Sequence, residues 1–195
     1  MSQGGQICMS TDTVVVVKDV AVELEQSLSR AVGSIDSSGF RVISDRSHTK
    51  IVELLEDARA RGASIVQPGQ DASKKPPNTH LPSLVIGLTS KMRYFHEESF
   101  GPLLGLVIVE NELEAERIVH SLGYGLSSAI WSKDVHGALS LARRIPVGAV
   151  HVNAPTVHDE QTLPHGGFGL SGFGRFGGTW GLREFTQTKT VILHP

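Results

Sequence analysis

Short runs of β-branched and aliphatic residues alternate with amphipathic stretches along most of this 195-residue chain. Residues 13–18 (TVVVVK) are short and rich in valine, as in a buried strand. Residues 45–61 place apolar side chains at the i, i+3, i+4 and i+7 spacing of a helix, which Gly62 ends. Further strands are expected at 65–66, 84–86, 106–109, 128–131 and 149–152, and further helices at 19–32 (capped by Asp19), 111–122 and 135–145. This alternation predicts an α/β fold with a mostly parallel sheet and flanking helices.

Two segments lie outside this rhythm. Residues 67–82 contain four prolines and two lysines and are expected to form a surface loop. Residues 190–193 (TVIL) follow a glycine-rich stretch and have the composition of a strand. We expect this last strand to dock elsewhere, on another subunit.

Composition and charge exclude several classes of function. A formal net charge of −2 gives no electrostatic reason to expect binding to nucleic acid or to an anionic membrane surface. The longest apolar runs, 14–17 and 103–109, are too short to span a bilayer. A single cysteine excludes an internal disulfide, and no signal segment follows Met1, so the expected location is the cytoplasm.

The single cysteine, Cys8, lies in the run GQICMST at residues 5–11, directly before the first expected strand. A lone cysteine is usually a small buried hydrophobe, whereas a catalytic one needs an activating environment. A glycine just ahead of the thiol lets the backbone approach a substrate closely. Cys8 is therefore a candidate nucleophile, with backbone N–H groups available to an oxyanion.

A second candidate element is the run EESFGP at residues 97–102. A carboxylate and an aromatic side chain directly before a Gly-Pro pair form a candidate ligand clamp. Glu98 and Phe100 are thus candidate ligand contacts. The alternative is that Glu97 and Glu98 are a solvated pair before a Gly-Pro turn, with Phe100 in the core.

Two other patterns do not indicate sites. Residues 166–178 contain two overlapping G-x-G-x-x-G matches, but without the strand before and the helix and acidic residue after that a dinucleotide-binding turn requires. The nine histidines are scattered and show no metal-ligating spacing on a helix. We therefore expect no Rossmann turn at 166–178 and no metal site.

Taken together, residues 5–11, 97–102, 148–160 and 164–190 resemble the aldehyde dehydrogenase family, most closely its vanillin and salicylaldehyde dehydrogenase branch. The resemblance implies that Cys8 is the catalytic thiol, that Glu98 holds the nicotinamide ribose and that Phe100 lies against the nicotinamide. It implies oxidation of an aromatic aldehyde to the acid, with hydride transfer to NAD or NADP. Val157 and His158 would lie in a loop that touches the substrate. His165 stands where many relatives have phenylalanine, which changes a side chain at the pocket edge.

The resemblance also implies a domain division. Residues 1–182 correspond to the catalytic domain, truncated at its N-terminal side, and residues 183–195 to an oligomerisation strand. The N-terminal NAD-binding domain, an oxyanion-binding asparagine and a general-base glutamate are absent from the sequence. NAD or NADP would bind only if that part were supplied, so the expected partners are the aldehyde and either a homo-oligomer or a complementing chain. Two alternatives stay open, namely a catalytically inactive interaction module and a thiol-only esterase.

Overall fold

The computed structural model describes residues 1–36, 38–69 and 76–195, which form two compact units, Met1–Leu122 and Gly123–Pro195. In the first unit a four-stranded sheet has the order β1-β6-β5-β3, formed by β1 (Thr13–Val17), β6 (Leu103–Val109), β5 (Ser83–Ile86) and β3 (Ser64–Val66). β1, β6 and β5 are parallel, while β3 runs antiparallel to β5. The prediction of a mostly parallel α/β sheet is confirmed, with one antiparallel edge strand.

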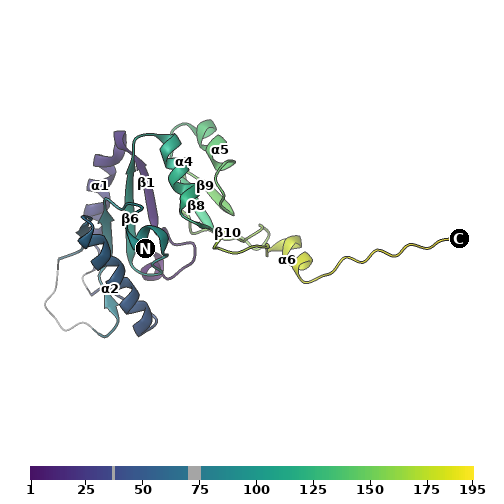
Figure 1. Cartoon of the computed structure of the whole chain (residues 1–195), viewed down its shortest axis with the longest axis horizontal. Coiled ribbons are helices and arrows are strands. Elements are labelled where there is room, and N and C mark those ends of the chain that lie inside the picture. The colour runs from purple at the N-terminus through teal and green to yellow at the C-terminus, as the bar shows by residue number, and fades with distance from the viewer. Residues whose placement is uncertain (37, 70–75) are drawn as a thin grey trace. The chain divides into compact units, whose positions relative to one another are not determined.

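Helices cover both faces of this sheet (Figure 1). α1 (Lys18–Gly33) packs on one face through Ala21 and Val32. On the other face, α2 (Asp45–Ala60) and α4 (Glu112–Ser121) flank a core that includes Ile51 and Leu54, both fully buried. These helices lie within two residues of their predicted bounds, because their apolar side chains repeat with the helical period.

The N-terminal caps of α2 and α1 differ in kind. Ser44 caps α2 by accepting a hydrogen bond from the backbone N–H of Ser47 at 3.1 Å. The prediction that Asp19 caps α1 is wrong, because Val17 occupies the cap position and Asp19 lies inside the first turn. There its carboxylate faces the positive end of the helix dipole, which is also favourable.

The predicted loop at 67–82 contains a short strand. β4 (Thr79–His80) pairs antiparallel with β2 (Phe40–Arg41), and the part of the loop at 70–75 lies outside the described residues. The His80 side chain is buried, with its ring centroid 4.3 Å from that of His48. Burial and the neighbouring His48 lower the pKa of His80 to about 4. A pure surface loop was therefore the wrong description of residues 79–82.

The second unit is built around a parallel pair of strands, β8 (Ser127–Ile130) and β9 (Ala149–Val152), connected through α5 (Val135–Ala142). Asp134 caps α5 by accepting a hydrogen bond from the N–H of Gly137 at 3.0 Å. β7 (Tyr124–Gly125) pairs antiparallel with β10 (Phe168–Gly169) in the glycine-rich stretch, and α6 (Gly178–Glu184) follows. Both β8 and β9 lie where the sequence predicted strands.

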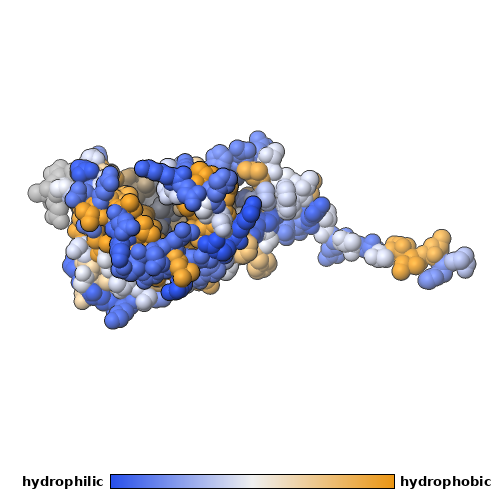
Figure 2. Space-filling view, turned by 90° about the horizontal axis from the view of Figure 1, so that it is seen from above, coloured by the Kyte–Doolittle hydropathy of each residue, from blue (hydrophilic) through white to orange (hydrophobic). Residues whose placement is uncertain are grey.

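Residues 186–195 after α6 form neither helix nor strand. The apolar side chains of Val191, Ile192 and Leu193 are between 72% and 93% exposed. Figure 2 shows them as an apolar group within an otherwise hydrophilic tail. The strand expected at 190–193 is thus not formed within the single chain, and its docking on another subunit remains a prediction.

One short helix completes the first unit. α3 (Arg93–His96) follows β5 and leads directly into the segment 97–101. Its Tyr94 and Phe95 side chains are buried in the core beside α2. No helix in the described part of the chain is long and apolar enough to cross a membrane.

Candidate functional site

The candidate thiol lies in an irregular loop before β1. A short 3-10 turn, η1 (Ser2–Gly5), is followed by a tight turn in which the N–H of Ser10 donates to the carbonyl of Ile7 at 2.8 Å. Gly4 and Gly5 have φ of 66° and 77°, a conformation that glycine adopts without strain. Cys8 is exposed. The loop therefore presents the thiol at the surface of the unit rather than in its core.

The glutamine of the thiol motif anchors this loop. The Gln6 side-chain amide donates to the carbonyl of Arg41 at 3.0 Å, and its oxygen accepts from the N–H of Ile43 at 3.0 Å. The first contact goes to the end of β2, a strand that the sequence did not reveal, and the second to the backbone two residues further on. The sequence therefore identified the motif without showing what Gln6 does in it.

The second motif lies in the segment between α3 and β6. Ser99 is 3% exposed, whereas Phe100 is 41% exposed and adopts φ of 45°. The backbone carbonyl of Glu98 accepts a hydrogen bond from Lys50 Nζ at 2.6 Å. The alternative interpretation required Phe100 to lie in the core, and the exposure of its side chain contradicts that interpretation. Its ring and the half-buried Glu98 lie beside one another in sequence and are available to a ligand.

The two motifs meet in space although more than 80 residues separate them. A Cβ atom added to Gly5 would lie 1.8 Å from the carbonyl oxygen of Gly101, so the two backbones are in direct contact. On its other side Gly101 faces Ile51, where an added Cβ would lie 2.3 Å from Cδ1. The fold therefore brings the thiol loop (residues 5–12) against the clamp segment (residues 97–101). Glycine is needed at both Gly5 and Gly101.

A half-buried carboxyl group that the sequence did not single out, that of Asp12, joins the same two segments. Asp12 accepts hydrogen bonds from both the backbone N–H and the hydroxyl of Ser99. Burial raises the pKa of Asp12 to about 6, and the two Ser99 hydrogen bonds oppose that shift by favouring the carboxylate. In sequence Asp12 is one polar residue between two threonines, with no signal that it would be buried.

The other side of the clamp segment is held by ionic contacts. Arg93 pairs with Glu97 at 2.8 Å and with Glu53 of α2 at 3.2 Å, and Asp57 accepts its backbone N–H at 2.8 Å. Glu97 and then Glu53 raise the pKa of Arg93, while Arg93 lowers that of Glu97. We call these four residues the Arg93 network; it ties the residue before Glu98 to α2.

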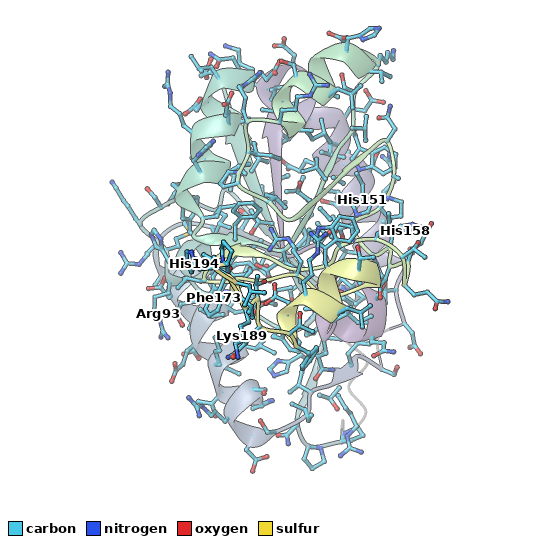
Figure 3. The ribbon with its side chains drawn as sticks, turned by 90° about the vertical axis from the view of Figure 1, so that its right-hand side faces the viewer. Arg93, His151, His158, Phe173, Lys189 and His194 are labelled. Atoms are coloured by element: carbon cyan, nitrogen blue, oxygen red, sulfur yellow. The ribbon has the colours of Figure 1, made fainter. Side chains whose placement is uncertain are left out.

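The predicted substrate-contacting residues all belong to the second unit. His158 lies beside His151 of β9, with ring centroids 5.8 Å apart (Figure 3), and its Nε2 is 3.2 Å from Glu160. Burial and the neighbouring His158 lower the pKa of His151. Val157 is half-buried in the same loop.

His165 has different partners. Its ring is 4.8 Å from that of Phe176, its backbone pairs with Phe176, and its Nδ1 is 4.0 Å from Asp159. Val157, His158 and His165 are thus loop residues of one unit, with different partners for the two histidines.

The glycine-rich stretch folds on itself. Arg175 Nη1 donates to the carbonyls of Gly167 and Gly174, at 3.0 and 2.6 Å, and the guanidinium lies 5.0 Å from the centroid of Phe168. These contacts connect turns around the two-residue strand β10. Within the described ranges, no three histidine, cysteine or acidic side chains are grouped so as to hold a metal ion.

Comparison with known proteins gives a consistent result. The family model described as "Aldehyde dehydrogenase family" matches residues 1–191. Vanillin dehydrogenase of Pseudomonas fluorescens is 36% identical over 197 residues, which covers 97% of this chain and 40% of that protein. Salicylaldehyde dehydrogenase of Pseudomonas putida is 34% identical over 200 residues, which covers 98% of this chain and 41% of that protein.

Solved structures agree with the sequence relatives. The salicylaldehyde dehydrogenase from Pseudomonas putida G7 complexed with salicylaldehyde superposes with a TM-score of 0.84 at 30% identity, covering 98% of this chain and 41% of that one. The betaine aldehyde dehydrogenase from Staphylococcus aureus in complex with NAD+ gives 0.83 at 30% identity, covering 94% and 38%. The chain thus spans about 40% of the length of the relatives that it matches.

Proposed function

Because the chain belongs to the aldehyde dehydrogenase family, we propose that it supplies the thiol and the nicotinamide-ribose contacts of an aldehyde-oxidising site. The observation that carries the proposal is the contact between the two motifs, with Gly5 against Gly101. That contact places the segment of Cys8 against the segment of Glu98 and Phe100. The Cys8 thiol and the Phe100 ring are both exposed, as a nucleophile and a ligand contact must be.

The residues fit the nicotinamide end of a dinucleotide. Phe100 offers an exposed ring face, and Glu98 is a half-buried carboxyl group beside it. A carboxylate in this setting suits two ribose hydroxyls. Glu98 and Phe100 are thus proposed as the residues that would hold NAD or NADP. The adenosine and pyrophosphate contacts would come from a dinucleotide-binding part, on a complementing chain or a longer product.

In the proposed chemistry, the Cys8 thiolate adds to the aldehyde carbon and forms a thiohemiacetal. The nicotinamide, when bound, supplies the hydride acceptor. Backbone N–H groups of the thiol loop would stabilise the oxyanion, and water would release the carboxylic acid and regenerate the thiol. The residues of this chain thus bind the substrate covalently and orient the ring against which it reacts.

Aromatic aldehydes are the proposed substrate class, because vanillin and salicylaldehyde dehydrogenases are among the relatives. Val157, His158 and His165 are proposed as substrate-contacting residues. The cytoplasm is the proposed location, where a single thiol stays reduced. The tail at 190–193 is proposed to pair with another subunit.

The test is calorimetric titration of the purified chain with NAD and with NADP, with benzaldehyde oxidation followed in the same samples. Cys8→Ala is expected to abolish turnover, and Ser90→Ala is a control at an exposed turn position of the same unit. Residual oxidation by Cys8→Ala would refute the nucleophile assignment. A folded chain that binds neither cofactor would refute the function for this chain alone.

A second function is favoured by a different observation, the exposed apolar group Val191–Leu193. A catalytically inactive relative that associates through this tail would form a stable dimer without cofactor affinity. Analytical ultracentrifugation of the full chain and of a variant with Val191, Ile192 and Leu193 changed to serine separates the two functions. A monomer in both samples would refute the interaction module.

A further inference from the structure

Asp12 occupies the last position of the thiol loop before β1 and is held from both sides. Its backbone carbonyl accepts hydrogen bonds from the Tyr94 hydroxyl at 2.9 Å and from the Gly105 N–H at 2.8 Å. These contacts fix Asp12 to α3 and to β6. The carboxyl group therefore starts from a defined position on the sheet, four residues after Cys8.

From that position the carboxyl group reaches the clamp segment. One oxygen, Oδ1, accepts both the Ser99 N–H, at 3.3 Å, and the Ser99 hydroxyl. Ser99 is 3% exposed and lies between Glu98 and Phe100. Since a Ser99 displacement would move both neighbours, the Asp12–Ser99 contact sets where the two clamp side chains stand relative to the thiol loop.

We propose that Asp12 is a positioning residue. Its carboxyl group holds the thiol loop against the clamp segment, and ionisation of that group favours separation of the two segments. The proposal rests on the proposed function for its catalytic meaning. Its physical content is that residues 5–12 and 97–101 are released together, in a step that exposes Asp12 to water.

The direction of the pH dependence follows from linkage. The folded pKa of Asp12 is about 6 and its ordinary value is 3.8, so the closed arrangement holds a proton that the open one releases. The closed state is therefore favoured at low pH and becomes less favoured as pH rises through 6. From pH 5 to pH 8 the opening equilibrium constant is expected to rise about tenfold.

Other groups that face Asp12 must be separated from this effect. Glu98 is the acidic neighbour whose charge helps to raise the pKa of Asp12. Burial and the nearby Asp12 raise the pKa of Tyr94 well above 10, so Tyr94 stays neutral across this range. Thr13 donates to Asp12 Oδ2 at 3.5 Å and does not ionise. Glu98→Gln is therefore the control that separates the effect of the Glu98 charge from the ionisation of Asp12 itself.

The experiment is residue-resolved amide exchange of the full chain between pH 5 and pH 8, corrected for intrinsic exchange rates. The reporters are the amides of Ser99, which bonds to Asp12, and of Ser10, which bonds to Ile7 inside the thiol loop. In the wild type, both protection factors are expected to fall about tenfold over this range, together. In Asp12→Asn they are expected to be independent of pH.

Two further variants keep the test decisive. Asp19→Asn makes the same change at an exposed position of α1 and should retain the wild-type pH dependence. Glu98→Gln removes a charge that raises the pKa of Asp12, so it should keep a pH dependence whose transition is moved to lower pH. Ser99→Ala leaves Asp12 in place but removes a hydrogen bond that favours the carboxylate. It is expected to move the transition to higher pH.

Three results would overturn the proposal: wild-type protection that does not change with pH, an unchanged pH dependence in Asp12→Asn, or a response of Ser99 without Ser10. Failure of the proposed function would look different. In that case NAD binding and benzaldehyde oxidation would be absent, while the exchange of Ser10 and Ser99 would still report whether the two segments are coupled.

Discussion

Replacing Gly5 by alanine tests the contact on which the site depends. The added Cβ would lie 1.8 Å from the carbonyl oxygen of Gly101, whereas an ordinary carbon–oxygen contact is about 3.3 Å. The two backbones would have to separate by about 1.5 Å. The backbone of Gly101 cannot move away from Gly5 without cost, because Ile51 lies directly behind it and is fully buried.

Two costs add at this position. A side chain at φ of 77° is strained by roughly 1–2 kcal/mol, and forcing apart packed groups typically costs about 1–3 kcal/mol more. We expect Gly5→Ala to lose about 2–5 kcal/mol of the free energy that holds the thiol loop in place. If the loop detaches before the core unfolds, global stability falls by less than this amount.

Gly62→Ala is the matched control, because Gly62 has φ of 95° with no atom within 4 Å of the added Cβ. It carries the backbone strain without the collision. Urea unfolding reports the global free energy of unfolding, and amide exchange at Ser10 reports the loop. If Gly5→Ala unfolds at the same urea concentration as Gly62→Ala and keeps its Ser10 protection, the close approach of the two motifs is refuted.

Two further predictions concern the core of the first unit. Leu54→Ala, at a fully buried position of α2, is expected to lower the free energy of unfolding by about 2–5 kcal/mol in urea titrations, and an effect below about 1 kcal/mol would contradict the packing. His80, whose pKa is about 4 in the fold and 6.5 when unfolded, binds its proton mainly in the unfolded state, so its contribution to stability is lost as pH falls below 6.5. Between pH 7.5 and pH 5 this loss is about 2 kcal/mol of the free energy of unfolding. It is measured as the difference between the pH profiles of the wild type and of His80→Gln, because Asp12 shifts stability in the opposite direction in both proteins. Equal pH profiles for the two proteins would refute it.

The sequence predicted the parts of the fold that repeat locally. β1, α2 and β9 lie within one residue of their expected ends, because valine-rich runs and helical spacing are set by neighbouring residues. β2 and β4 were missed, since two-residue strands exist only through pairing between distant segments. The antiparallel direction of β3 is likewise set by its partner β5 rather than by its own residues.

The candidate site divides in the same way. Cys8, Glu98 and Phe100 were found through motifs, and the structure confirms that their segments touch while leaving their chemical roles as proposals. Asp12 was missed because burial of a carboxyl group depends on Tyr94, Ser99 and Gly105, all more than 80 residues away. Such a residue has no local pattern by which a sequence could reveal it.

The Arg93 network gives the clamp segment a second anchor of a different physical kind. Its Arg93–Glu97 ion pair lies at the surface, with 44% of the Arg93 side chain and 37% of the Glu97 side chain exposed. Mobile ions screen charges at the surface over about 10 Å at 0.1 M salt, whereas the Asp12–Ser99 contact is largely shielded from them. One end of the segment is thus sensitive to ionic strength and the other to proton concentration. The position of Phe100 should consequently depend on two properties of the surrounding solution that can be varied independently.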